Sequence, residues 1–148
     1  LLLACGQLLA IPASLLMPLL AERWGNGRIY VYGSWAIAVS FIPMALVPHW
    51  AAAGLGYLGT TTFLAVARPA LVAFQMAAVS TDWRTLMAGA TTAAVGWGWA
   101  VASLSGGFII TRSGYPALFI FSAIMTALAA VVFRAYLGAR PANTVPLD

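Results

Sequence analysis

The sequence predicts an all-α, polytopic membrane protein: a helical bundle with five transmembrane helices. Composition is the first observation, because 63% of the 148 residues are hydrophobic and only 7% are charged, whereas an average soluble domain is about 25% charged. The charge pattern is the second observation. Seven arginines and three acids divide the chain into long uncharged runs, and these runs are apolar on all faces instead of alternating as barrel strands do. The composition therefore excludes a soluble domain, a disordered chain and a nucleic-acid-binding protein.

The uncharged runs give the helices in order, because a spanning helix needs about 20 apolar residues. The run 29–67 is long enough for two crossings, and Pro48, His49 and Trp50 form its natural break. The run 69–81 is too short to span alone and is joined to the segment before Arg68. The predicted helices are 1–20, 29–47, 51–79, 86–110 and 116–133, within a transmembrane bundle 1–137 that is followed by a cytoplasmic tail 138–148.

Arginine placement predicts the orientation in the membrane. With five crossings, one side holds five arginines and the other holds only Arg112; the five are Arg23, Arg28, Arg84, Arg134 and Arg140. The positive-inside rule places the five in the cytoplasm. The sequence thus predicts a multi-pass protein of the cell membrane with a cytoplasmic C-terminus. Because the chain starts with Leu1 inside a predicted helix, we expect it to be a piece of a longer protein.

The loop between the first two predicted helices carries a compact motif. An acid and an arginine are followed by glycines and a second arginine, in the order Glu22, Arg23, Gly25, Gly27, Arg28. Such a loop can clamp two helix ends, since the two glycines permit a tight reversal and Glu22 can pair with an arginine of a neighbouring helix. The alternative is an ordinary short basic cytoplasmic loop.

This loop resembles the cytoplasmic loop signature of the major facilitator superfamily, G-x-L-[AS]-[DE]-R-x-G-R-R-[RK]. Matching positions are Leu20, Ala21, Glu22, Arg23, Gly25 and Arg28, whereas Pro18, Asn26 and Gly27 depart from the signature. The segment Arg84 to Gly89 is similar to the family's R-G-x-x-x-G, with Thr85 in place of glycine. The stretch 98–107 is close to G-x-x-x-G-P-x-x-G-G, with Ala102 and Ser103 replacing the glycine–proline pair. Residues 106–119 resemble the short outer turn between the family's last two helices.

The resemblance implies that the five helices correspond to helices eight to twelve of a twelve-helix transporter. Such a protein would be a secondary transporter of a small solute that works by alternating access, with efflux of small amphipathic compounds as one candidate activity. Its partners would be the lipid bilayer, the solute and the missing N-terminal half of the same transporter. The cytoplasmic loop motif would comprise Glu22, Arg23, Gly25, Arg28 and Arg84.

Polar residues recur along the predicted helix 51–79. Tyr57, Thr61, Arg68 and Gln75 follow one another at intervals of four, seven and seven, which places them on one stripe. Polar groups inside a membrane usually face a bundle interior or a water-filled cavity, so these residues are substrate-cavity candidates, together with Gln7 of the first helix. The alternative for Arg68 is a side chain that snorkels to the headgroups.

Small residues on the predicted helix 86–110 indicate close packing, because helices in lipid associate where backbones can approach. These residues are Gly89, Gly96, Gly98, Ala102 and Gly106. An enzyme is disfavoured, since the chain has one histidine, one cysteine and no acidic pair or metal-ligand cluster within a helix. No cofactor or metal is expected. The alternative function is a small membrane subunit or scaffold that packs with partner helices and transports nothing.

Overall fold

The computed structural model describes residues 2–47 and 49–139, and their side chains from Gly6 onward. It contains α1 (Leu2–Trp24), α2 (Asn26–Leu46), α3 (Trp50–Ala77), a short 3-10 helix η1 (Thr81–Trp83) and α4 (Arg84–Ala139). Pro48, Arg140 and residues 141–148 of the predicted tail lie outside the described residues.

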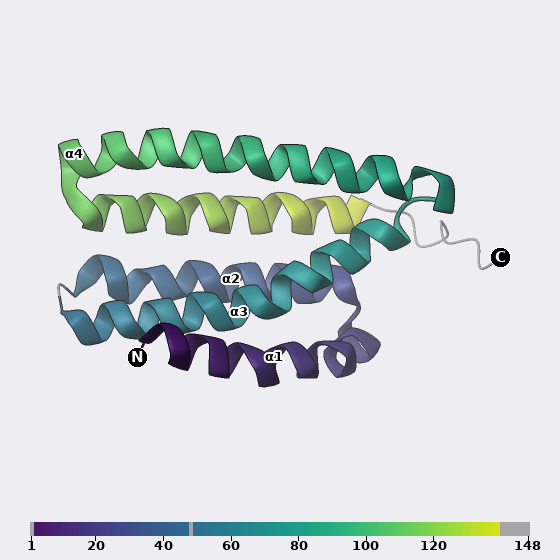
Figure 1. Ribbon diagram of the computed structural model, residues 1–148, viewed down its shortest axis with the longest axis horizontal. Helices are drawn as coiled ribbons and strands as arrows, with labels where there is room; N and C mark the ends of the chain where they lie inside the picture. The colour runs from purple at the N-terminus through teal and green to yellow at the C-terminus, as the bar shows by residue number, and fades with distance from the viewer. Residues whose placement is uncertain (1, 48, 140–148) are drawn as a thin grey trace.

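Helix α4 reverses its direction at Gly114 and forms two antiparallel arms, 84–113 and 115–139 (Figure 1). Gly114 has φ 78° and ψ 178°, a conformation that glycine adopts without the steric cost of a Cβ atom. Pro116 follows at once, and its fixed φ suits the first turn of the second arm. The predicted break between residues 110 and 116 therefore corresponds to a sharp turn at Gly114.

The helices lie side by side along the long axis of the molecule (Figure 1). Helix α2 packs against α3 and against α4, while α1 packs mainly against α3. Aromatic contacts Tyr30–Phe133 and Phe41–Phe119 join α2 to the second arm of α4. We call the end that holds the α1–α2 junction and the C-terminal end of α4 the Gly25 end, and the opposite end the Gly114 end.

The all-helical prediction is confirmed, since no strand occurs among the described residues. Three helical stretches are long and apolar enough to cross a membrane, namely Asn26–Leu46, Trp50–Ala77 and Thr81–Ala139. The last of these contains both arms of α4. The five separate crossings stay a prediction.

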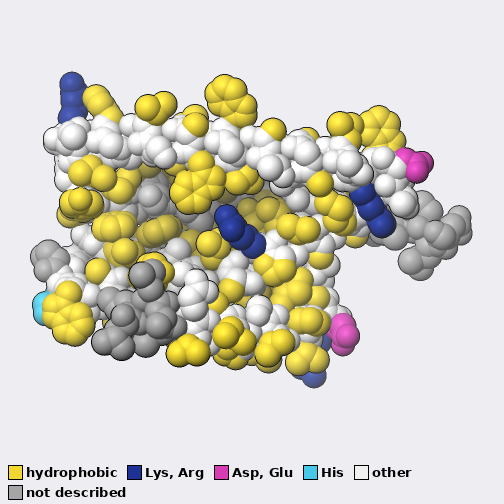
Figure 2. All heavy atoms as spheres, in the orientation of Figure 1, with side chains coloured by type: hydrophobic (Ala, Val, Ile, Leu, Met, Phe, Trp, Pro, Cys, Tyr) yellow, Lys and Arg dark blue, Asp and Glu magenta, His cyan; other side chains and the backbone are white. Residues whose placement is uncertain are grey.

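The outer surface of the bundle is apolar, whereas the buried core is small. Large hydrophobic side chains are exposed on every helix, and Leu104 and Trp97 are 78% and 75% exposed. The buried hydrophobic residues are Ile29, Val31, Ile37, Ala38, Ala67, Ala70 and Ala130. In Figure 2 most of the visible charged side chains lie toward the two ends, with one basic side chain among hydrophobic neighbours near the middle. This distribution is compatible with a multi-pass membrane protein.

Close helix packing occurs at glycines of α2 and α3, and on the predicted helix 86–110 at Gly106, which is buried and where an added Cβ atom would lie 3.6 Å from Cδ1 of Leu118. A Cβ atom added at Gly33 would lie 3.0 Å from the Cβ of Ala67, and one added at Gly59 would lie 2.5 Å from Oγ of Ser40. At the other predicted glycines of the helix 86–110, Gly89, Gly96 and Gly98, nothing lies within 4 Å of an added Cβ atom. Those glycines face open space in this chain, since the first arm of α4 has few neighbours.

Candidate functional site

The polar stripe of α3 is defined as Tyr57, Thr61, Arg68 and Gln75. It spans 19 residues, whose 18 intervals of 1.5 Å give a length of about 27 Å. Tyr57, Thr61 and Gln75 are half-buried, and Arg68 is exposed. The hydroxyl of Thr61 donates a hydrogen bond to the carbonyl oxygen of Tyr57 at 2.6 Å, so part of its polarity is satisfied within the helix. The four residues are spread along the length of α3 and do not form a compact cluster.

The N-terminal part of the polar stripe, Tyr57 and Thr61, contacts α1. A Cβ atom at Gly6 would lie 3.2 Å from Oγ1 of Thr61 and 3.2 Å from Cε1 of Tyr57, which shows that both side chains point toward α1. Gln7, the next residue along α1, is exposed. The structure thus brings Gln7 to the level of Tyr57 and Thr61, whereas Arg68 and Gln75 lie two and four helical turns farther along α3.

Arg68 lies near mid-depth of the bundle. Because α3 continues through Pro69 to Ala77, Arg68 is about 7 Å beyond the midpoint of the helix. A second measure agrees: its neighbour Ala67 contacts Gly33, and Gly33 is only about 4–5 Å from the midpoint of α2. The hydrocarbon core of a bilayer is about 30 Å thick. Both helices therefore place the backbone of Arg68 within the depth of such a core.

The loop motif lies at the Gly25 end. Glu22 and Arg23 are exposed in the last turn of α1, and Arg28 is exposed in the first turn of α2. Arg84, also exposed, begins α4 after η1. The expected pairing of Glu22 with an arginine does not occur among the described residues. The structure brings the motif to one end of the bundle without joining its charges.

Gly25 makes the reversal between α1 and α2 alone, with φ 76° and ψ 146°. The expectation that Gly27 shares this role is wrong, because Gly27 is already inside α2 and buried. It has a different function: a Cβ atom there would lie 2.8 Å from Cδ2 of Leu137. The absence of a side chain at Gly27 lets the C-terminal end of α4 approach α2.

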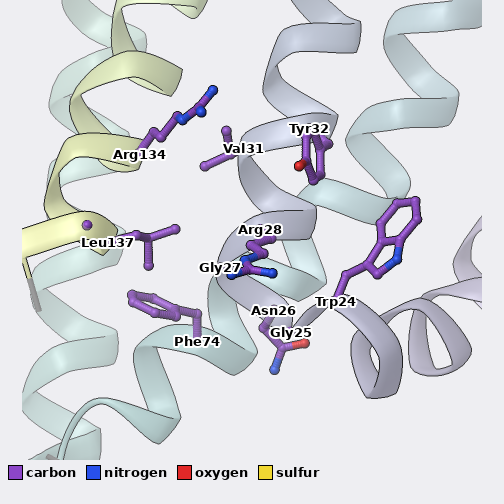
Figure 3. A pocket seen from close by; sticks show the side chains of 11 residues that line it. Trp24, Gly25, Asn26, Gly27, Arg28, Val31, Tyr32, Phe74, Arg134 and Leu137 are labelled. Atoms are coloured by element: carbon purple, nitrogen blue, oxygen red, sulfur yellow. The ribbon is translucent and has the colours of Figure 1, made fainter. Parts of the chain in front are cut away.

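A cavity of about 690 Å³ opens at the Gly25 end, between the α1–α2 junction, α3 and α4 (Figure 3). We call it the Gly25-end cavity. Aromatic and aliphatic side chains form much of its wall: Trp24, Val31, Tyr32, Phe74 and Leu137. Phe74 contacts Phe133 edge-on at 5.2 Å between ring centroids, so the wall is tied to the second arm of α4. None of the substrate-cavity candidates lines this cavity.

Two arginines border the Gly25-end cavity, Arg28 from α2 and Arg134 from α4. Figure 3 shows Val31 between the two side chains. No acidic residue of the described chain lines the cavity, so its charge is positive. Asn26 also lines it, and the buried Oδ1 of Asn26 has no hydrogen-bond partner among the described residues. The arginines give the cavity the charge that an anion requires.

Four residues that line the cavity were not predicted as site residues from the sequence: Asn26, Phe74, Arg134 and Leu137. Arg134 served only as a marker of orientation. Arg28 and Arg134 lie at the same end of the bundle because α4 turns back at Gly114. The glycine at the turn is the feature of the sequence that indicates this reversal. No protein-family model matches the chain, and the comparisons with curated proteins and with solved structures find no match either.

Proposed function

We propose that this chain is the C-terminal part of a secondary transporter of the major facilitator superfamily, which moves a small solute across the cell membrane by alternating access. One observation carries the proposal. Arg68 is exposed at mid-depth of the bundle, on a helix long and apolar enough to cross a membrane. A charged residue at this depth is costly, and in membrane proteins it usually faces a cavity, a partner or a solute path.

The rest of the polar stripe supports a solute path along α3. Tyr57, Thr61 and Gln75 share the stripe with Arg68 and are only half-buried. A solute that moves along the stripe would meet Arg68 as its charged contact near mid-depth and the other three residues, one after another, as neutral hydrogen-bond partners. Gln7 would contribute from α1 at the level of Tyr57.

The first arm of α4 supports a partner for this chain. Its large side chains Trp97, Trp99 and Leu104 are exposed, and its glycines Gly96 and Gly98 face open space. Small residues allow close approach of a further helix in lipid. We propose that the N-terminal half of the same transporter supplies such helices and completes the solute path.

The proposed orientation places the Gly25 end in the cytoplasm, because arginines gather there. Ser80, the N-cap of η1, is exposed at this end, and Ser113 is exposed beside Gly114 at the other. In a Cys5→Ala background, we expect Ser113→Cys to react with a membrane-impermeant thiol reagent in intact cells, and Ser80→Cys to react only after permeabilisation. Labelling of Ser80→Cys but not of Ser113→Cys in intact cells would reverse the orientation.

The chain alone should not transport, because a path shared by two halves cannot alternate with one half present. Liposomes that contain only the purified 148-residue chain should accumulate no more of any small amphipathic solute in a test panel than empty liposomes do. Liposomes with the chain and its upstream half should accumulate at least one of them. Uptake by the chain alone would show that it needs no second half.

A further inference from the structure

Two arginines line the Gly25-end cavity, and no acid of the described chain lines it. Arg28 is in the first turn of α2 and Arg134 is near the end of α4, and both line the cavity. A planar guanidinium binds the oxygens of a phosphate through two parallel hydrogen bonds. Two such groups at one cavity favour a ligand with several anionic oxygens over a solute with a single acceptor.

Backbone donors at the start of α2 border the same cavity. Asn26 and Gly27 line it, and the N-cap Gly25, whose own N–H donates to the carbonyl oxygen of Ala21, offers no side chain to accept from the first turn. The first N–H groups of a helix have no partner inside the helix, and the helix dipole favours an anion there. These donors add to the arginines, which are the charged part of the site.

The walls and the size of the cavity fit a ligand that carries apolar parts as well. Its volume of about 690 Å³ lies within the range of ligand pockets. Trp24, Tyr32 and Phe74 line it beside Val31 and Leu137. Tryptophan and tyrosine concentrate at the headgroup level of membranes, and basic pockets between membrane helices on the cytoplasmic side bind anionic headgroups.

We propose that the Gly25-end cavity binds a phosphate group, held by Arg28, Arg134 and the N-terminal N–H groups of α2. The phosphate can belong to an anionic lipid headgroup or to free inorganic phosphate, and the chemistry of recognition is the same. This binding site is separate from the polar stripe of α3.

The test is a binding titration on the protein purified from its membrane in nonionic detergent. The two probes are short-chain phosphatidylglycerol and sodium phosphate, and diacylglycerol with the same acyl chains serves as the ligand without phosphate. We expect Arg28→Gln and Arg134→Gln each to raise the dissociation constant about tenfold, since each removes a charge-assisted pair. Arg112→Gln is the matched control, because Arg112 lies at the Gly114 end, and should bind as the wild type does.

A steric variant keeps the test valid if either arginine variant fails to fold. Gly138 lines the cavity, and nothing lies within 4 Å of a Cβ atom there, so Gly138→Leu adds a bulky side chain at the cavity while it leaves every charge in place. We expect it to weaken phosphate binding as the arginine variants do. If the arginine and Gly138 variants weaken binding of phosphatidylglycerol and Arg112→Gln does not, the cavity is a lipid site. If the same variants weaken binding of sodium phosphate, it is a site for the free anion. Binding that is equal in all variants, equal for diacylglycerol, or absent for both probes overturns the proposal.

Discussion

Replacing Arg68 with alanine is expected to abolish solute transport while the amount of protein in the membrane stays largely unchanged. The guanidinium is exposed at mid-depth of the bundle, so it contributes little to packing. A charge at the centre of a bilayer costs about 2.5–3.5 kcal/mol on insertion scales. Its removal should therefore leave insertion unharmed or improved, while the solute path loses its charged contact.

The partner of Arg68 has to come from outside the described chain. The acids of the described residues are Glu22 and Asp82, and both lie at the Gly25 end. An acid of the N-terminal half, an anionic group of the solute or cavity water would compensate the charge. Arg68→Lys should give intermediate transport, since lysine keeps the charge but loses the planar fork that binds a carboxylate or phosphate on two bonds.

The measurement is solute flux in cells that produce the full transporter, normalised to the protein found in the membrane. Arg112→Ala is the matched control, because Arg112 lies at the Gly114 end, where its guanidinium stacks on Phe108 at 4.7 Å. It should transport as the wild type does. Normal transport by Arg68→Ala would identify Arg68 as a snorkelling residue and would remove it from the proposed solute path.

Charge spacing divides the chain into apolar stretches because charged residues are rare in lipid-facing segments. The described helices extend beyond these stretches. Helix α1 continues through Glu22 and Arg23 to Trp24, and the second arm of α4 continues through Arg134 to Ala139. Arginine and glutamate are good helix formers, so a helix does not stop where its apolar run stops. The predicted boundaries record where apolar composition ends and not where the backbone changes conformation.

The polar stripe of α3 could be placed from its intervals because 3.6-residue periodicity fixes which residues share a face. The depth of Arg68 could not, since it depends on whether the helix continues past Pro69. The Gly25-end cavity was beyond prediction for another reason. It requires Arg28 and Arg134 to lie at the same end of the bundle, and the approach of α4 to α2 there depends on Gly27 and Leu137 packing against each other.

Glycine spacing likewise does not tell which glycines have a neighbour. Gly56 and Gly98 both lie in helices rich in small residues, yet only Gly56 is buried at a helix contact. A Cβ atom at Gly56 would lie 2.7 Å from the carbonyl oxygen of Ser40 and would also clash with the side chain of Met44. Membrane helices associate through such close approaches, so Gly56 determines the spacing of α2 and α3.

Gly56→Ala is therefore expected to destabilise the bundle by about 1–3 kcal/mol, as over-packing of a close contact does, and Gly56→Leu should prevent assembly of α2 on α3. The measurement is the unfolding midpoint of the purified protein in a titration with denaturing detergent. Gly98→Ala is the control, because nothing lies within 4 Å of a Cβ atom there, and it should unfold at or above the wild-type midpoint.

A double variant separates the two parts of the clash at Gly56. Met44→Ala removes the flexible side chain but leaves the backbone oxygen of Ser40 in place. In a Met44→Ala background, Gly56→Ala should therefore lower the unfolding midpoint by less than it does in the wild type. It should still lower the midpoint. A backbone oxygen cannot rotate away as a side chain does, so the helices still have to separate. Equal midpoints for Gly56→Ala and Gly98→Ala would show that α2 and α3 do not approach each other at Gly56.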